Sequence, residues 1–233
     1  MNERDLLDIY KHRFLQKQMA IKDAVWTILG KYLSKRLLKL TGKRDFSILD
    51  LAAGSCEFIN HVNTRGKKTA VDFNPDVKKC AGEGIEVICA SALDFSAFVK
   101  GKYDVVFVSN FFEHLNSPEE LLQCLAQIAC VLKSGGILMV LQPNIDLLNT
   151  SYWNFIDHKL PINAPRLKEA AGLHQFFLKE QILRFLPYST CGKMPKWSWL
   201  VRLYLLLLPF SGLFFGKQSL FVFKKNSCAS DET

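Results

Sequence analysis

The sequence lacks several patterns that would assign it to a familiar class. Its seven cysteines contain no C-x-x-C pair, and the odd number argues against a disulfide framework or a zinc site. We therefore expect no metal ion. No charged N-terminal head precedes an uninterrupted apolar run and a cleavage site, so we expect a cytoplasmic protein. Repeats and low-complexity tracts are missing, and 233 residues that are 49% apolar suffice for one domain, residues 1–233.

Basic residues outnumber acidic ones near both ends of the chain. Residues 1–44 hold eleven Lys and Arg against four Asp and Glu, and residues 193–225 hold six against none. The positive charge behind the net value of +8 therefore lies in these two segments, and the rest of the chain is mildly acidic. This asymmetry suits an anionic partner such as a membrane surface, a phosphate-bearing substrate or nucleic acid. For the N-terminal part, solvated helix faces are at least as good an explanation. We expect no nucleic-acid partner, because the chain has no N/D-P-P-Y/F motif and no RNA-binding module.

The apolar pattern divides the domain into a helical segment (1–44), a cofactor-binding core (45–142) and a substrate-side connection with closing strands (143–233). The first segment contains an amphipathic helix over Ile21–Leu33. In the core, β-rich runs alternate with helical patterns, which predicts a parallel sheet with crossover helices. The expected strands are Ile48–Leu51, Thr69–Phe73, Ile85–Cys89, Val105–Ser109 and Gly136–Gln142, then one within His174–Phe185 and a closing strand at Leu220–Phe223.

Helix starts are visible at two places in the core. One follows Asn74-Pro75-Asp76, and a stronger one begins at Ser117-Pro118-Glu119-Glu120, which can form a capping box. The second helix should run to about Leu132, before Lys133-Ser-Gly-Gly136 turns the chain into the next strand. Beyond it, Asn144–Pro165 is expected to be a long connection, and a short helix over Leu167–Ala171 should be closed by Gly172.

The most apolar stretch is Trp197–Phe215. Arg202 interrupts it and Pro209 breaks it, so it is a poor candidate for a membrane-spanning helix. We expect an apolar helix that is buried or interfacial. Packing on the sheet is favoured over peripheral membrane contact, because surface helices bury similar apolar stripes.

A glycine-rich dinucleotide turn is also missing. The strand through Asp50 leads into a small-residue turn, but the positions of G-x-G-x-x-G hold Ala52, Gly54 and Glu57. A pyrophosphate would meet Glu57, so NAD is disfavoured. Asp72 ends the next strand, 22 residues after Asp50, at the spacing that places an acid beside a bound ribose. The residues favour a cofactor with a ribose and an ammonium group but no phosphate.

Five motifs in order resemble class I S-adenosylmethionine-dependent methyltransferases. They are Leu49-Asp-Leu-Ala-Ala-Gly-Ser-Cys-Glu-Phe58, Val71-Asp-Phe-Asn-Pro75, Ser91-Ala-Leu-Asp94, Tyr103-Asp-Val-Val-Phe-Val-Ser-Asn-Phe-Phe-Glu-His-Leu115 and Leu132-Lys-Ser-Gly-Gly136. The resemblance covers about residues 46–142. It implies an α/β fold, a three-layer Rossmann-like sandwich around a mostly parallel seven-stranded sheet with an antiparallel last strand. N-terminal helices and the apolar C-terminal helix would be added to it.

The resemblance also implies residues for the methionine part of S-adenosylmethionine, whose product is S-adenosylhomocysteine. Asp50, Ala52 and Gly54 would line this part, and the Asn110 backbone carbonyl would accept from the ammonium group. The family usually has glycines where this chain has Ala52 and Cys56, and their side chains narrow the turn. This departure keeps open a second interpretation, a non-catalytic cofactor-binding or membrane-associated adaptor.

For the adenosine part, the resemblance implies four further residues. Asp72 would bind both ribose hydroxyls, Phe73 would lie against the adenine ring, and Ser91 and Ala92 would meet its edge. Two alternatives are ordinary structural roles. Phe73 could simply pack in the core, and Asp72 could cap a helix.

Methyl transfer from a sulfonium is an in-line displacement, and a hydroxyl acceptor must also lose a proton. His114 is the best candidate for a base, because it follows Asn110 on the loop that borders the reactive end of the cofactor. Glu113 could orient the amine or the acceptor. Asp157-His158 form a second candidate pair on the long connection. For each histidine, hydrogen bonds that only stabilise a loop are an equally good explanation.

The later part of the chain resembles a bacterial methyltransferase subgroup associated with cell-surface polysaccharide and glycosyltransferase systems. The motifs are Leu141-Gln-Pro-Asn144, Tyr152-Trp153, Phe155-Ile-Asp-His158 with Pro161, Glu169-Ala-Ala-Gly172, Arg184-Phe-Leu-Pro-Tyr188 and Gly216-Lys-Gln218. This resemblance implies O-methylation of a small molecule or saccharide, including a lipid-linked glycan at the inner face of the membrane. It predicts no oligomeric state.

Overall fold

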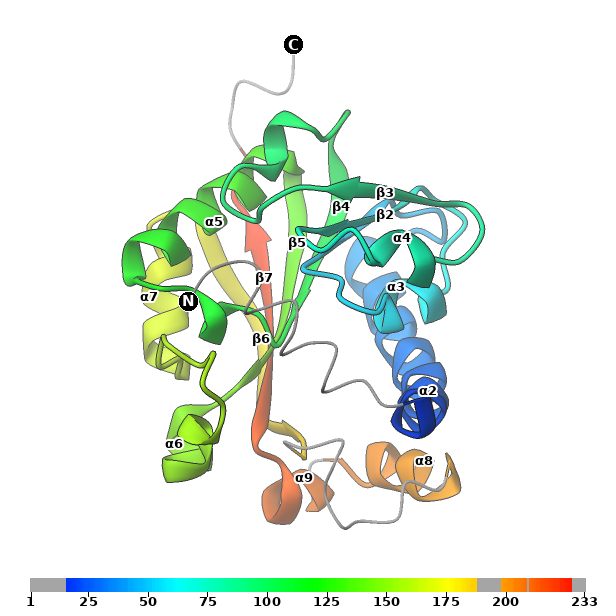
Figure 1. Ribbon diagram of the computed structural model, residues 1–233, viewed down its shortest axis with the longest axis vertical. Coiled ribbons are helices and arrows are strands. Elements are labelled where there is room, and N and C mark those ends of the chain that lie inside the picture. Colours follow the sequence, from blue (N-terminus) through cyan, green and yellow to red (C-terminus); the bar gives the residue numbers. More distant parts are fainter. Residues whose placement is uncertain (1–15, 188–197, 209, 228–233) are drawn as a thin grey trace.

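The computed structural model describes residues 16–187, 198–208 and 210–227. Its centre is a seven-stranded sheet in the order β3-β2-β1-β4-β5-β7-β6 (Figure 1). All neighbouring strands from β3 to β5 are parallel, and β7 is antiparallel to both β5 and β6. The strands are β1 (Ile48–Leu51), β2 (Lys68–Asp72), β3 (Ile85–Cys89), β4 (Tyr103–Ser109), β5 (Leu132–Pro143), β6 (Phe176–Leu186) and β7 (Gln218–Lys225).

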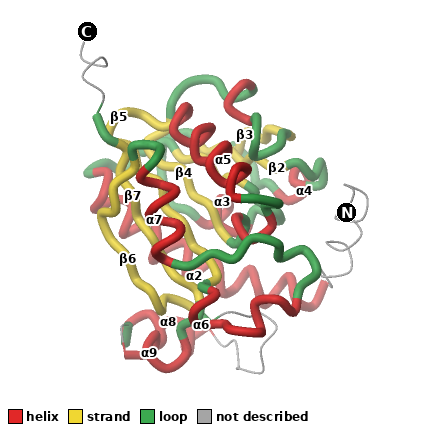
Figure 2. Tube along the Cα trace, turned by 90° about the vertical axis from the view of Figure 1, so that its left-hand side faces the viewer, coloured by secondary structure: helices red, strands yellow, loops and turns green. Residues whose placement is uncertain are grey.

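Helices cover both faces of the sheet, which confirms the three-layer prediction. One face carries α2 (Gln16–Thr41) and α3 (Glu57–His61), and the other carries α5 (Pro118–Val131) and α7 (Ala164–Gly172) (Figures 1 and 2). Each face buries its own apolar cluster. On the α2 side, Trp26 meets the rings of Phe58 and Phe107 edge-on, at centroid distances of 6.3 and 6.5 Å.

Most strand predictions agree with the structure, and one turn prediction is wrong. The strands at Ile48–Leu51 and Ile85–Cys89 have the predicted bounds. The segment Lys133–Gly136, predicted to be a turn before a strand, lies within β5. Tyr103 pairs with Leu132 and Val105 pairs with Ile137. The four residues of this segment therefore lie opposite Asp104 alone, and the register of the two strands shifts there. Because strand pairing resumes on both sides of it, the four residues bulge instead of ending the strand.

The helix predictions are right in type, and two of them are too short. The N-terminal helix is 26 residues long and extends beyond Ile21–Leu33 at both ends. Ser117 caps α5 as expected, since its side chain accepts from the Glu120 amide. The helix after Asn74-Pro75-Asp76 is α4 (Val77–Cys80), and α7 is longer than the predicted Leu167–Ala171. The connection Asn144–Pro165 is partly helical, with α6 (Ile145–Leu148) and the 3₁₀ helix η3 (Asn149–Asn154).

The apolar stretch near the C-terminus departs most from its prediction. It forms two short helices, α8 (Ser198–Leu206) and α9 (Phe210–Phe215), and not one; Trp197 and Pro209 lie outside the described residues. Leu205 of α8 is buried against the α2 side of the core. Packing on the sheet is nevertheless wrong for most of the large side chains, which are exposed: Trp199, Leu203, Leu206, Leu207, Phe210, Leu213, Phe214 and Phe215. Among the described residues, no helix is long and apolar enough to cross a membrane.

Candidate active site

In the turn between β1 and α3, every second residue from Ala52 to Cys56 has a left-handed backbone conformation. Ala52, Gly54 and Cys56 all have left-handed conformations, with φ of 57°, 54° and 60°. Glycine adopts this region without cost, whereas an L-side chain adds strain there, which explains the glycines of related turns. Ala52 and Cys56 therefore retain the turn despite their side chains. The Cys56 side chain is buried, and its thiol lies 3.8 Å from the Val77 carbonyl oxygen.

Asp72 ties this turn to the end of β2. Its Oδ2 accepts from the Gly54 amide and its Oδ1 accepts from the Asn74 amide, both at 2.8 Å. The residue at the cap position of α4 is Asp76, so the helix-cap alternative for Asp72 is wrong. Burial raises the pKa of the Asp72 carboxyl, and the two amide bonds lower it. Each carboxylate oxygen has a second lone pair with which it can accept from a hydroxyl.

Asp50 lies deeper, on β1 and beneath the turn. The residue is only 3% exposed. Burial raises the pKa of its carboxyl well above the ordinary value, and the nearby Glu57 and Asp72 raise it further. Burial therefore makes the carboxylate form of Asp50 costly. A ligand ammonium group close to Asp50 would offset this cost.

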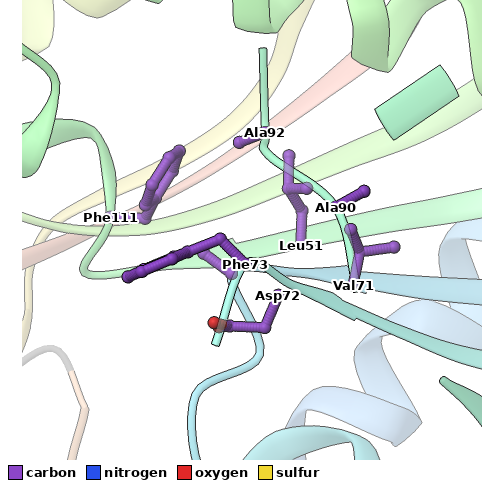
Figure 3. A pocket seen from close by; sticks show the side chains of 8 residues that line it. Leu51, Val71, Asp72, Phe73, Ala90, Ala92 and Phe111 are labelled. Atoms are coloured by element: carbon purple, nitrogen blue, oxygen red, sulfur yellow. The ribbon is translucent and has the colours of Figure 1, made fainter. Parts of the chain in front are cut away.

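A small pocket opens beside Asp72 at the carboxyl ends of the strands (Figure 3). Phe73 lines it and is 37% exposed, so the core-packing alternative for this ring is wrong. Phe111, from the loop after β4, lies at the same end of the pocket (Figure 3). The full lining is Leu51, Ala52, Val71, Asp72, Phe73, Ala90, Ala92 and Phe111. Apolar walls, an exposed aromatic ring and one carboxylate suit an adenosine group.

The structure brings most of the predicted cofactor residues to this edge of the sheet, but not all of them into the pocket. Ala52, Asp72, Phe73 and Ala92 line it. Ser91 is exposed next to Ala92, and its hydroxyl accepts from the Leu93 amide at 3.2 Å. The sequence prediction missed Phe111, although its place directly after Asn110 at a strand end was a usable signal.

Asn110 turns the chain out of β4. Its φ of 49° is left-handed, and its amide donates to the Leu141 carbonyl at 2.9 Å. The side-chain nitrogen donates to the Ser109 hydroxyl at 3.1 Å. Its Oδ1 is buried and has no hydrogen-bond partner among the residues that the structure describes. An acceptor oxygen of this kind is available to a donor on a bound ligand.

The two candidate pairs for proton handling form one cluster. Glu113 and His114 lie on the 3₁₀ helix η2 (Phe112–His114), and His158 comes from the connection after β5. The two imidazole rings are 5.1 Å apart, and His114 Nε2 is 3.9 Å from Glu113 Oε1. The Glu113 carbonyl accepts from the amides of Lys159 and Leu160, which fixes the connection against η2. Burial lowers the pKa of the His158 imidazole.

Hydrogen bonds hold each member of this cluster. His114 Nδ1 is 3.1 Å from the Asp157 carbonyl oxygen and 3.3 Å from its Oδ2. His158 Nδ1 is 2.7 Å from the Tyr152 carbonyl oxygen, so the predicted loop-stabilising bond is present. Glu113 Oε2 accepts from the Gln142 side chain at 2.6 Å. The sequence prediction missed Gln142. This residue becomes a neighbour of Glu113 only because the end of β5 lies beside η2 in the folded protein.

Comparisons with known proteins agree with this geometry. Residues 49–140 match the family model described as a methyltransferase domain. No curated protein matches the sequence. The matched residues begin in β1 and end in β5, so they contain the turn, Asp72, the pocket and the Glu113-His114 pair.

Several solved structures have the same fold. An S-adenosylmethionine-dependent methyltransferase from Archaeoglobus fulgidus is 19% identical, with a TM-score of 0.59 over 84% of this chain and 94% of that chain. One from Clostridium acetobutylicum is 12% identical, with a TM-score of 0.62 over 96% and 99%. The N-methyltransferase NodS from Bradyrhizobium japonicum, in complex with S-adenosylhomocysteine, is 13% identical, with a TM-score of 0.57 over 84% and 86%. At these identities the likeness shows the fold. Together with the methyltransferase domain matched over residues 49–140, it supports an S-adenosylmethionine-dependent methyltransferase.

Proposed function

We propose that this enzyme methylates a hydroxyl group of a small molecule or saccharide, with a lipid-linked cell-surface glycan as the leading acceptor. The acceptor oxygen attacks the methyl carbon of the sulfonium, the carbon–sulfur bond breaks, and its electron pair stays on sulfur in S-adenosylhomocysteine. The hydroxyl proton passes to the polar groups of the site or to water. The protein has two tasks, to align the acceptor with the methyl group and to assist loss of this proton.

In this proposal Asp50, Ala52, Gly54 and the Asn110 carbonyl hold the methionine part of the cofactor. Asp72 holds the ribose, while the adenine lies against Phe73 with its edge at Ser91 and Ala92. The polar contacts at Asp72 support the ribose assignment, because a buried carboxylate that is already held by two amides needs no rearrangement to accept from a diol.

The cluster of Glu113, His114 and His158 is the observation that favours a hydroxyl over an amine as the methyl acceptor. An amine attacks through its neutral form, whereas a hydroxyl is a poor nucleophile until its proton is shared or removed. Two imidazoles and a carboxylate at the edge where the cofactor binds are suited to that task. The solved N-methyltransferase named above has the same fold, so the fold alone does not choose between nitrogen and oxygen.

The exposed side chains of α8 and α9 support a membrane-bound acceptor. Seven large apolar side chains are exposed on these two helices and Leu207 is exposed between them, far more than scattered surface residues would explain. The exposed cations Arg184, Arg202 and Lys217 accompany them, and residues 193–225 contain no Asp or Glu. An apolar surface among cations is complementary to an anionic bilayer, here the inner face of the cytoplasmic membrane.

This surface also lies at a useful edge of the sheet. Gln218 begins β7 directly after α9 and pairs with Pro143, at the carboxyl end of β5. The cofactor pocket is built from the carboxyl ends of the neighbouring parallel strands. A bilayer against α8 and α9 would therefore lie at the edge where methyl transfer takes place.

The decisive experiment is a mass-spectrometric assay of the full chain with S-adenosylmethionine. The panel contains nucleotide sugars, lipid-linked saccharides and matched amino sugars. We expect a product heavier by one methylene unit from a hydroxyl acceptor, and a larger yield when the acceptor is in anionic vesicles. Methylation of the amino sugars alone would overturn the O-methylation proposal, and equal yield from free and vesicle-bound acceptors would overturn the membrane part.

A further inference from the structure

The cluster at η2 has the composition of a cation site. Glu113, His114 and His158 each offer one ligand atom, and these three atoms lie within 4.8 Å of one another. Two imidazoles and one carboxylate are a common ligand set for divalent first-row transition metals. Ligands of one such cation lie about 2.1 Å from it and hence roughly 3–3.5 Å apart, so a small inward rotation completes the site. The cysteine spacings that argue against a metal do not concern these three ligands.

The hydrogen bonds of both histidines prepare the same ring nitrogen for a ligand. His114 Nδ1 faces the two Asp157 oxygens, and His158 Nδ1 faces the Tyr152 carbonyl. A carbonyl oxygen only accepts, so each Nδ1 donates and the lone pair of the neutral ring is on Nε2. Metal-binding histidines are held in this way, through a carboxylate or a backbone carbonyl on the other nitrogen. A single general base would need only one such imidazole, whereas this cluster has two.

Gln142 adds a third, independent observation. It is 1% exposed, and its Nε2 donates to Glu113 Oε2 at 2.6 Å. Its Oε1 is buried and has no hydrogen-bond partner in the described part of the chain. An unpartnered amide oxygen on the group that orients a ligand carboxylate is costly unless a donor is bound close to it. Water or a hydroxyl on a cation is such a donor.

The geometry points to a binding site for one divalent first-row transition cation, with Glu113, His114 and His158 as ligands and Asp157, Tyr152 and Gln142 as the groups that orient them. Its role rests on the proposed O-methylation. The cation would bind an acceptor that presents two neighbouring oxygens, and it would favour the alkoxide form of the one that is methylated, whose proton would leave to water because the three side chains of the cluster are occupied as ligands. The specificity that follows is for a vicinal diol over an isolated hydroxyl.

The test measures cation binding directly. Full-length protein is stripped with a chelator and titrated with Co²⁺ and Mn²⁺, followed by the visible spectrum of Co²⁺ and the electron paramagnetic resonance of Mn²⁺. We expect one bound cation per chain and at least about tenfold weaker binding in Glu113→Gln and His158→Gln. The matched control is His61→Gln on α3, where the imidazole pairs with Asp23 instead. Melting temperature and S-adenosylhomocysteine affinity are measured on each variant to establish that it is folded.

The outcomes separate the cation site from the proposed function. Saturable binding that the two ligand variants lose and the control keeps supports the site, even if no acceptor is methylated. Absence of binding to the folded wild-type protein, or unchanged binding in folded His158→Gln, overturns the site. Methyl transfer to a diol that continues undiminished after chelation overturns its role, and it leaves the O-methylation proposal in place.

Discussion

The carboxylate of Asp72 accepts a hydrogen bond from the Gly54 amide at 2.8 Å, joining the end of β2 to the turn after β1. The same side chain borders the pocket (Figure 3). One residue thus fixes the shape of the turn and offers an anionic acceptor to a ligand. Removing it should affect cofactor binding through both routes.

We expect Asp72→Ala to weaken S-adenosylhomocysteine binding about tenfold to a hundredfold, since hydrogen bonds to a charged group are worth about 1.5–3 kcal/mol. Isothermal titration calorimetry provides the dissociation constant. The control is Asp76→Ala, which removes a nearby carboxylate that pairs with Lys79 on the surface. Unchanged affinity in Asp72→Ala would refute the ribose assignment.

Ala52 carries backbone strain that a glycine would relieve. Its φ is 57°, and an L-side chain in the left-handed region costs about 1–2 kcal/mol. Glycine regains this energy but loses about 0.4–1 kcal/mol through the entropy of the unfolded chain. Ala52→Gly should therefore stabilise the protein by about 0.5–1 kcal/mol in urea unfolding. The adjacent Ala53 is outside the left-handed region, so Ala53→Gly should destabilise; the same sign for both variants would contradict the explanation.

Asp50 makes the stability of the empty protein depend on pH. Its pKa in the folded state lies above the ordinary value of 3.8, so its favourable contribution is complete below that value and is lost as pH rises through the raised pKa. Asp50→Asn removes the buried charge, and it should raise the melting temperature at about pH 8 by more than at about pH 5. A shift that is equal at both pH values, or a less stable variant at pH 8, would contradict this.

The same substitution should have the opposite effect on the loaded protein. The ammonium group of the cofactor loses an anionic neighbour in Asp50→Asn, so thermal stabilisation by S-adenosylmethionine should shrink. Sinefungin, which retains the ammonium group, should show the same loss, and 5′-methylthioadenosine, which has no ammonium group, should not. This contrast tests the placement of Asp50 at the amino-acid end of the cofactor.

Sequence patterns predicted the parts of this site that depend on residues close to one another in the chain. The spacing of Asp50 and Asp72 follows from one strand-helix-strand unit, and the carboxyl ends of parallel strands must share one edge. The left-handed turn could also have been recognised, since Ala52, Gly54 and Cys56 alternate where related turns have glycine. These features need no knowledge of distant contacts.

The rest depends on tertiary contacts that no local pattern contains. His158 lies beside His114 because the amide of Lys159 donates a hydrogen bond to the carbonyl of Glu113, which is distant in the sequence. The segment Lys133–Gly136 has turn residues, yet pairing with β4 resumes beyond it and retains it in β5. The apolar residues of α8 and α9 resemble a core helix in sequence, and only the assembled fold leaves them exposed.

His114 lies at the centre of the proposed chemistry, whether it receives a proton or binds a cation. We expect His114→Ala to lower methyl transfer about a hundredfold or more at saturating cofactor, with an unchanged dissociation constant for S-adenosylhomocysteine. The control is His174→Ala, at the turn between α7 and β6, outside the cluster. Full activity in a folded His114→Ala variant would exclude both roles.

The exposed surface of α8 and α9 predicts binding to anionic lipid. Sedimentation with phosphatidylglycerol vesicles should recover the protein, and neutral phosphatidylcholine vesicles should recover less of it. The difference between the two kinds of vesicle should be larger at low salt, where charges are screened less. Phe214 is 76% exposed, and burial of such a side chain is worth about 1.5–3 kcal/mol, so Phe214→Glu should weaken vesicle binding at least about tenfold.

Leu173 provides the matched control for this surface. It is 68% exposed, but it lies next to the start of β6, whereas α8 and α9 connect the opposite end of β6 to β7. Leu173→Glu adds the same charge at an equally accessible apolar position, so it should leave vesicle binding unchanged if the bilayer meets only the two C-terminal helices. Equal loss in both variants would mean that added negative charge alone weakens binding. Wild-type protein that stays in solution with anionic vesicles would exclude the membrane contact.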